Sequence, residues 1–346
     1  MEVIAECYIL DVGQGSSSVV LLGQSRCIVI DCPRGPHCSP LPTLRLLQRH
    51  GIASIEVLAI SHNDADHEGG AAAILMEYSS RIGQVAMLQD RAAPDMRFAR
   101  AVLHARDRGQ FAGPVLRLET PALGQRKVLW EDRKRSLRLV VLYPDFAGNL
   151  GAQVKREPNQ TSAVLAFCGP NSTILFPGDC GIDAWAAIAE RSPDKRVECD
   201  VVAVPHHGGL TGGALSGDWV GAVRRAYSEV LRAKVGIVSV GTFNPYGHPR
   251  AEVIRSLTSG GAVVMCTQIT SKCCAALDRL GVGVLSCNEF SCSTFGRKST
   301  RSGQPKNVAC AGSVVLEITD RGLAIPRLQE HRRAIQESRL VKPLCC

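Results

Sequence analysis

The sequence predicts an α/β protein in which two β-sheets are packed between two layers of helices. Short apolar segments typical of strands come in close succession over the first 31 residues. Further along the chain, such segments alternate with amphipathic helical stretches, for example at 69–79 and 250–258. A chain of 346 residues with 45% hydrophobic and 21% charged residues can enclose one large core. Strand pairs followed by alternating strands and helices therefore favour a layered sandwich.

The expected elements follow one another along most of the chain. Strand-like apolar runs are found at 3–11, 17–22, 27–31, 57–61, 137–143, 162–168, 172–177, 200–204, 235–240 and 262–266. Helical periodicity is found at 41–50, 69–79, 95–108, 181–190, 219–231 and 250–258. The basic stretch 126–138 is expected to form a hairpin, whose charges either protect a sheet edge or contact nucleic acid.

One stretch of ten residues, 61–70, carries the strongest chemical signal. His62, Asp64, Asp66 and His67 lie within six residues, directly after an apolar strand. Desolvating such side chains is costly unless a cation compensates, so the cluster predicts a metal site. His62 and Asp64 share one side of an extended backbone, whereas Asp66 and His67 can turn toward a second position. The alternative is a solvated loop with Asp64 or Asp66 as helix cap, which leaves both histidines unexplained.

Two later strand exits also carry ligand-type side chains. Asp179 follows the segment 172–178, and the pair His206-His207 follows an apolar run that begins at Val201. Loops at strand ends converge in layered α/β proteins, so these side chains are expected to join the first cluster. Taken alone, Asp179 would be a turn residue after Pro-Gly and His206 an ordinary loop histidine. Their combination with the first cluster favours a metal centre.

These motifs resemble those of a known superfamily. The pattern from His62 to His67 is similar to the HxHxDH signature of the metallo-β-lactamase superfamily, with Asp64 in place of the second histidine. Together with the segment DVGQG at 11–15, that aspartate most resembles the hydrolase domain of ComEC-type competence and DNA-uptake proteins. Further matching segments are Asn159–Ser162, Pro177–Asp179, Val204–Gly208 and Val240–Pro249.

The resemblance implies the αββα four-layer sandwich of the metallo-β-lactamase fold. The hydrolase domain is expected over residues 1–320, with a cysteine-rich insertion at about 266–312 and a last strand near 313–319, followed by a basic tail at 321–346. The chain departs from the family in having Ser16-Ser17-Ser18 where an aspartate is usual. No apolar run approaches the roughly 18 residues that cross a bilayer. Since the N-terminus also lacks a secretory signal, we expect a free-standing cytoplasmic hydrolase without a membrane channel.

By family position, the resemblance implies two divalent cations bridged by Asp179. The expected metal ligands are His62, Asp64, Asp66, His67, Asp179 and His206. His62 and Asp64 would hold one cation. Asp66, His67 and one member of the pair His206-His207 would hold the other. His206 is preferred as ligand to its neighbour His207, which is expected to support catalysis together with Asp66 and His248. An aspartate at position 64 favours manganese or magnesium relative to an all-imidazole zinc site, so zinc, manganese and magnesium are all candidates.

The residues expected to contact substrate are Ser16, Asn159, Tyr246 and His248. By family analogy, His248 can stabilise an oxyanion or protonate a leaving group. The alternative is a structural histidine that caps the helix beginning at Arg250. Tyr246 either hydrogen-bonds substrate or only packs. Asn159 falls near where many superfamily members carry another metal-binding histidine, and an amide is a weaker ligand.

The expected activity is metal-dependent hydrolysis of a phosphodiester, with DNA or RNA as the leading substrate. The formal net charge of +8 and the pI near 8.8 agree with a nucleic-acid partner. Aromatic residues, at 5%, do not indicate an extended stacking platform for single strands. The alternatives are a small phosphodiester or a lactone as substrate, and a non-catalytic metal-binding module. No feature of the sequence identifies a protein partner.

The cysteines and the C-terminal tail leave alternatives open. Fifteen cysteines, an odd number, indicate reduced thiols rather than a disulfide framework. Six of them lie close together and are Cys266, Cys273, Cys274, Cys287, Cys292 and Cys310. They either bind a structural zinc ion or pack as small hydrophobes, and the second interpretation is preferred because no CxxC pair is present. The basic tail is expected to form either an amphipathic helix against the body or a loose arm.

Overall fold

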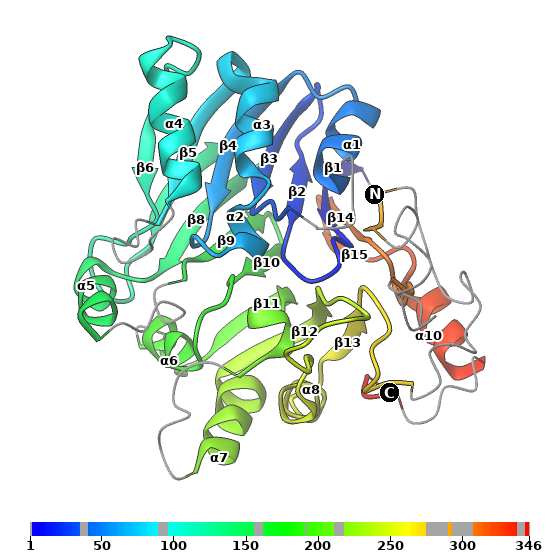
Figure 1. Ribbon diagram of the computed structural model, residues 1–346. Helices are drawn as coiled ribbons and strands as arrows, with labels where there is room; N and C mark the ends of the chain where they lie inside the picture. The colour runs from blue at the N-terminus through cyan, green and yellow to red at the C-terminus, as the bar shows by residue number, and fades with distance from the viewer. Residues whose placement is uncertain are drawn as a thin grey trace.

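Two β-sheets face each other between outer layers of helices in the computed structural model (Figure 1). The structure describes residues 2–34, 41–88, 96–155, 162–190, 192–210, 218–274, 290–292, 307–337 and 343–345. The predicted α/β, αββα four-layer sandwich is confirmed.

The first sheet has eight strands in the order β15-β14-β1-β2-β3-β4-β5-β6. Their bounds are β1 Val3–Ile9, β2 Ser18–Leu21, β3 Arg26–Ile30, β4 Ser54–Ile60, β5 Ile82–Met87, β6 Val115–Arg117, β14 Val314–Thr319 and β15 Gly322–Ala324. Strands β3 to β6 run parallel, and the pairs toward β15 run antiparallel. Strand β14, near the C-terminus, lies beside β1 near the N-terminus, so segments from both ends of the sequence share one sheet.

The second sheet has seven strands in the order β13-β12-β11-β10-β9-β8-β7. Their bounds are β7 Lys127–Asp132, β8 Leu137–Tyr143, β9 Val164–Gly169, β10 Ser172–Phe176, β11 Val197–Ala203, β12 Leu231–Val238 and β13 Val263–Cys266. Strands β10 to β13 run parallel. Strands β7 and β8 form the expected basic hairpin. The carboxyl ends of β10, β11 and β12 therefore open on one edge.

Helices cover the outer face of each sheet. The first sheet is covered by α1 Pro42–Arg49, α3 Ala71–Tyr78 and α4 Arg97–Asp107. The second is covered by α6 Asp183–Ala189, α7 Trp219–Arg224 and α8 Ala251–Ser259. The remaining helices are α2 Ala65–Glu68, α5 Phe146–Lys155 and α10 Leu328–Glu337. In α10, His331 and Ile335 are buried while Arg332 and Arg333 are exposed, so this part of the tail is an amphipathic helix.

The apolar core lies in three layers. The middle layer joins the sheets and includes Phe167, Leu139 and Ile174 from the second sheet and Val57 and Ile28 from the first. The other two layers lie between each sheet and its helices. Because both faces of the central strands are covered, these strands read as nearly continuous apolar runs, which made them recognisable in the sequence.

Several elements differ from the sequence expectation. Strands β5 and β6 were not expected, because β6 is short and β5 contains Gly83 and Gln84, which break the strand pattern. Helix α5 was not expected either, because Gly148 and Gly151 lower its helix propensity. The helix expected at 219–231 is an α-helix only to Arg224 and continues as a π-helix to Val230.

The described cysteines are mostly buried in the core. Cys266, Cys273, Cys274 and Cys310 belong to the layer between the second sheet and its helices. Among the described residues, no group of three thiols and imidazoles here brings its ligand atoms within 4.8 Å of one another. Cys287 lies outside the described residues. Cys292 is disulfide-bonded, which departs from the expectation of reduced thiols throughout.

Within the described part of the chain, no helix combines the length and apolarity that a bilayer crossing requires.

The middle core layer can be tested by removing one large ring from it. Phe167 has no exposed surface and packs between the sheets, so Phe167→Ala is expected to lower the free energy of unfolding by about 3–5 kcal/mol. Met76→Ala, at a side chain that is 81% exposed on α3, is the control and should change it by less than about 0.5 kcal/mol. Chemical denaturation of both variants measures the difference, and equal stabilities would contradict the described packing.

Candidate metal centre

The predicted ligands lie at the carboxyl ends of parallel strands from both sheets. Asp31 follows β3, the segment from Ser61 to His67 follows β4, and Asp179 follows β10. The pair His206-His207 follows β11. Sites in open α/β sheets commonly lie at this edge, because loops from neighbouring strands meet there. The sandwich therefore brings together residues that are more than a hundred positions apart in sequence.

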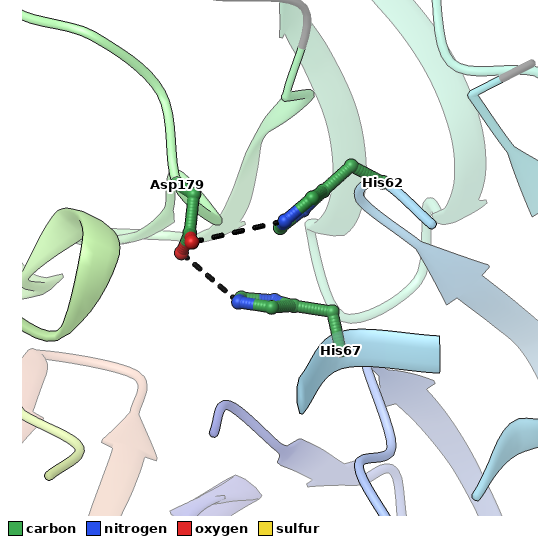
Figure 2. Close-up of side chains that lie close together, drawn as sticks. All are labelled: His62, His67 and Asp179. Atoms are coloured by element: carbon green, nitrogen blue, oxygen red, sulfur yellow. Dashed lines mark ion pairs between the residues drawn. The ribbon is translucent and has the colours of Figure 1, made fainter. Parts of the chain in front are cut away.

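A first group of three side chains surrounds the carboxylate of Asp179 (Figure 2). Nε2 of His67 lies 2.9 Å from Oδ1 of Asp179, and Nε2 of His62 lies 3.8 Å from Oδ2. One ligand atom from each of the three residues falls within 4.8 Å of the others, and all three side chains are buried. Both imidazoles point toward the carboxylate from the same side of the loop (Figure 2).

A second group contains Asp66, His67 and His207. Nε2 of His207 lies 3.3 Å from Oδ2 of Asp66 and 3.8 Å from Oδ1 of Asp179. His67 belongs to both groups, and the two oxygens of Asp179 face histidines of both. The carboxylate of Asp179 therefore lies between two adjacent groups of ligand atoms.

The donor atoms of these groups suit a divalent cation. The Nε2 atoms of His62, His67 and His207 are buried, and no described residue completes a hydrogen bond to any of them. Buried polar atoms are normally paired, and imidazole nitrogens facing carboxylates form the ligand set of zinc and related ions. The residues present thus fit bound metal, and the mixed nitrogen and oxygen set is compatible with zinc or manganese.

Strong electrostatic coupling is a further property of the cluster. Burial favours the neutral form of a carboxyl group, yet His67, His207 and His62 hold the pKa of Asp179 well below its usual value. Burial likewise opposes ionisation of Asp66, but the neighbouring imidazoles of His207 and His67 lower its pKa to about 2. Both carboxylates are therefore ionised at neutral pH and available to a cation.

Asp31, which the sequence analysis did not select, orients His67. Its Oδ2 lies 2.8 Å from Nδ1 of His67, and it also accepts hydrogen bonds from the backbone N–H and the hydroxyl of Ser61. A carboxylate behind a metal-binding histidine keeps the proton on Nδ1 and directs the lone pair of Nε2 toward the metal. Its place at the end of the strand expected at 27–31 was the signal that could have identified it.

Ser162 performs a similar task for His62. Its hydroxyl lies 3.2 Å from Nδ1 of His62 and accepts a hydrogen bond of 2.9 Å from the backbone N–H of Asp179. Gly178 has φ of +52°, and a Cβ at this position would collide with the hydroxyls of Ser61 and Ser162. The glycine of the Pro-Gly-Asp turn is therefore required by the close approach of two loops.

The pair His206-His207 has left-handed backbone geometry at both residues, with φ of 49° and 55°. Non-glycine residues adopt this region at a cost of roughly 1–2 kcal/mol each, which the surroundings must offset. Nδ1 of His207 is bonded at 2.9 Å to the carbonyl oxygen of Ser239 on the next strand exit, and its side chain is buried. His206 is less buried, and its Nε2 lies 3.7 Å from Asp179. His207 is thus the member of the pair that faces Asp66.

The other predicted residues surround this centre at different distances. Asp64 is 54% exposed, its Oδ2 lies 3.5 Å from Nε2 of His62, and its side chain does not cap α2. The backbone N–H of Ser16 donates to the carbonyl oxygen of Asp66 at 3.0 Å. Asn159 lies outside the described residues. Asp11 of the DVGQG segment bonds to Gln268 and does not reach the ligand groups that the structure describes.

His248 packs against the histidine pair. Its ring lies 5.0 Å from that of His206, and burial and the neighbouring imidazoles lower its pKa to about 4. Its side chain does not cap α8, whose N-terminal cap residue is Arg250. Gly209 leaves the room for this ring, because a Cβ there would lie 2.6 Å from Nε2 of His248. Tyr246 stacks on His248 with ring centroids 5.7 Å apart.

The histidine and aspartate cluster lies at the carboxyl ends of strands in an αββα sandwich. This combination decides the fold assignment. The chain has the metallo-β-lactamase fold. Solved structures similar to it include the metallo-hydrolase Igni18 from Ignicoccus hospitalis, at 13% identity over 76% of this chain and 94% of that one, with a TM-score of 0.45. Another is Tm1679, a metal-dependent hydrolase of the β-lactamase superfamily, at 12% identity over 76% and 95%, also with a TM-score of 0.45. No family model matches the sequence.

Among curated proteins, the chain is similar to Recombination protein 2 of Haemophilus influenzae. The two sequences are 26% identical over 262 residues, which is 72% of this chain. The match spans 26% of the relative's length, so this chain corresponds to about a quarter of that protein. The similarity is consistent with the resemblance to ComEC-type hydrolase domains.

Replacing Asp31 should weaken metal binding without removing a ligand. Asp31→Asn leaves His67 without its carboxylate partner, so the affinity for a divalent cation is expected to fall about 10- to 100-fold. The matched control is Asp200→Asn, because Asp200 also accepts a backbone hydrogen bond but pairs with Lys234 at the opposite end of the second sheet. Titration against a chromophoric chelator measures both affinities. Equal affinities for the two variants would remove Asp31 from the centre.

Metal affinity should rise with pH. Burial alone would lower the pKa of His67, but Asp179 and Asp31 outweigh burial and raise it well above its ordinary value. His67 is therefore protonated in the metal-free protein at neutral pH, and a cation must displace that proton from Nε2. Calorimetric titrations at several pH values, in buffers of different ionisation enthalpy, should show proton release and tighter binding as the pH increases. A pH-independent affinity with no proton release would contradict this coupling.

Proposed function

We propose that the chain is a hydrolase of phosphodiester bonds, with DNA or RNA as substrate and two divalent cations in the described centre. The observation that carries the proposal is the position of Asp179 between two ligand groups that share His67. Paired cations bridged by one carboxylate are a recurring arrangement in enzymes that cleave phosphate esters.

The residues divide between the two cation positions. His62 and Asp64 would hold one cation together with Asp179, and Asp66, His67 and His207 would hold the other. When bound, the cations would supply a water of lowered pKa and neutralise negative charge on the substrate. We place His207 in the ligand set because its Nε2 faces Asp66, and leave His206 at the more exposed rim. The expectation that His206 is the metal ligand stays a prediction. Measurements of metal binding by single variants of His206 and of His207 can decide it.

His248 would act on the substrate. Nδ1 of its ring is buried, and no described residue completes a hydrogen bond to it. The ring faces His206 at the edge of the centre, where a substrate oxygen could approach. In this position the imidazole can hydrogen-bond a non-bridging oxygen or assist the leaving group. Ser16, Asn159 and Tyr246 are proposed as further substrate contacts.

Charge and similarity support a polyanionic substrate. The chain has a formal net charge of +8, and basic chains favour phosphate backbones over neutral substrates such as lactones. Its relative from Haemophilus influenzae is named for recombination, a process that acts on DNA. A small phosphodiester would use the same centre, so the substrate is decided by assay.

Substitution of the two groups tests the activity. Purified wild-type protein with Mn²⁺, Mg²⁺ or Zn²⁺ is expected to cleave single- or double-stranded nucleic acid, while Asp179→Ala and His62→Ala should lose at least about a hundredfold in rate. The matched control is Asp200→Ala, which removes a carboxylate that lies away from the centre. This variant should cleave at the wild-type rate.

Three other results would count against the proposal. Retained cleavage in both centre variants would show that a contaminant or another site cuts. Metal binding without cleavage of nucleic acid would direct attention to small phosphodiesters and lactones. A failure to bind metal at all would support a non-catalytic module.

A further inference from the structure

The loop at residues 241–248, here called the aromatic loop, exposes two aromatic rings beside the metal centre. Its ends are buried at Thr242 and His248. Between them, Phe243 is 67% exposed and Tyr246 is 60% exposed. Large apolar side chains at a surface are common singly, but two exposed rings three residues from one another on a single short loop are unusual enough to suggest a ligand.

Hydrogen bonds hold the aromatic loop in shape. Oδ1 of Asn244 accepts from the backbone N–H of His248 at 2.8 Å, and Nδ2 donates to the carbonyl oxygens of Gly241 and His248 at 3.0 Å each. The backbone N–H of Thr242 donates to Gln268, and the Thr242 hydroxyl accepts from the N–H of Val308. Because these hydrogen bonds hold the loop in one conformation, a ligand can bind to its rings without a large loss of conformational entropy.

The aromatic loop reaches the metal centre through a series of ring contacts. Tyr246 stacks on His248 at an interplanar angle of 30°, and His248 meets the ring of His206 at 5.0 Å. His206 in turn lies 3.7 Å from Asp179. A ligand that lies over Tyr246 is therefore adjacent to the position where a bond would be cleaved.

Arg250 adds a positive charge near His248. Arg250 is exposed and follows His248 by two residues, and its backbone N–H is held at 2.8 Å by the carbonyl oxygen of Gly208. Within the part of the chain that the structure describes, no carboxylate lies within 4.0 Å of its guanidinium group. Its positive charge acts on His248, which places it at the same rim.

We propose that Phe243, Tyr246 and Arg250 form a subsite for single-stranded nucleic acid, in which the rings stack on unpaired bases and Arg250 binds the adjacent phosphate. The proposal rests on the phosphodiesterase function proposed above and names its substrate class. Unpaired bases can stack on protein rings whatever their sequence, whereas bases of a duplex are already stacked on one another. The low aromatic content of the chain concealed this pair, because composition counts rings and does not locate them.

Equilibrium binding tests the subsite separately from catalysis. A short oligonucleotide containing 2-aminopurine is titrated with the full-length protein in a chelator, so that no cleavage occurs and quenching reports stacking. Phe243→Ala and Tyr246→Ala are each expected to weaken single-strand binding roughly five- to a hundredfold and to reduce quenching. Tyr246→Phe keeps the ring and should retain both, and Met76→Ala, an exposed apolar side chain on α3, is the surface control. Binding of a matched duplex should change less than about twofold in all variants.

The outcomes separate this inference from the proposed function. Single-strand binding and quenching that persist in both alanine variants would overturn the subsite, even if the wild-type protein cleaves nucleic acid. Equal losses for single strand and duplex would also overturn it, because a general electrostatic or folding effect would then explain both. Stacking that is lost in the alanine variants of a protein that cleaves nothing would support the subsite and remove the proposed hydrolysis.

Discussion

The structure depends on one buried carboxylate. Asp179 is 2% exposed and lies among four imidazoles contributed by two other strand exits. An isolated buried charge is too costly to maintain, so the loops that supply His62, His67 and His207 must converge on it. That convergence requires the parallel ends of β4, β10 and β11 to meet at one edge, and the packing of the two sheets provides this. The geometry of the metal site and the packing of the two sheets therefore depend on each other.

The backbone is strained at several residues of the metal centre. Asp31, His206 and His207 all have positive φ, in a region that side chains rarely occupy. Each is held by polar contacts from a neighbouring strand exit, such as Ser61 on Asp31 and the carbonyl of Ser239 on His207. Strain of this kind persists only when the surroundings determine it, and it is concentrated at functional sites. The rigid strands supply that support, while the loops carry the reactive groups.

The fold could be predicted where its elements are buried on both faces. Strands such as β2 and β9 are largely apolar runs, so their composition indicates that they are buried. Strands β5 and β6 and helix α5 could not be recognised, because β6 is short and glycines interrupt β5 and α5. Tertiary packing supplies the stability that local propensity lacks there. The π-helical end of the helix after Trp219 is likewise set by the packing of its neighbours.

By itself, the sequence determined the chemical character of the site, because ligand-type side chains directly after apolar strands are costly without a cation. It also determined the layered fold, because the order of strands and helices limits the arrangements available. Only the tertiary structure decided that His207 rather than His206 faces Asp66, because contacts between separate strand exits, such as that of His207 with the carbonyl oxygen of Ser239, set the direction of its ring. It also decided that Asp31 supports His67 and that the exposed ring of Tyr246 stacks on His248. These contacts join segments far apart in the chain, and no local pattern encodes a distance between them.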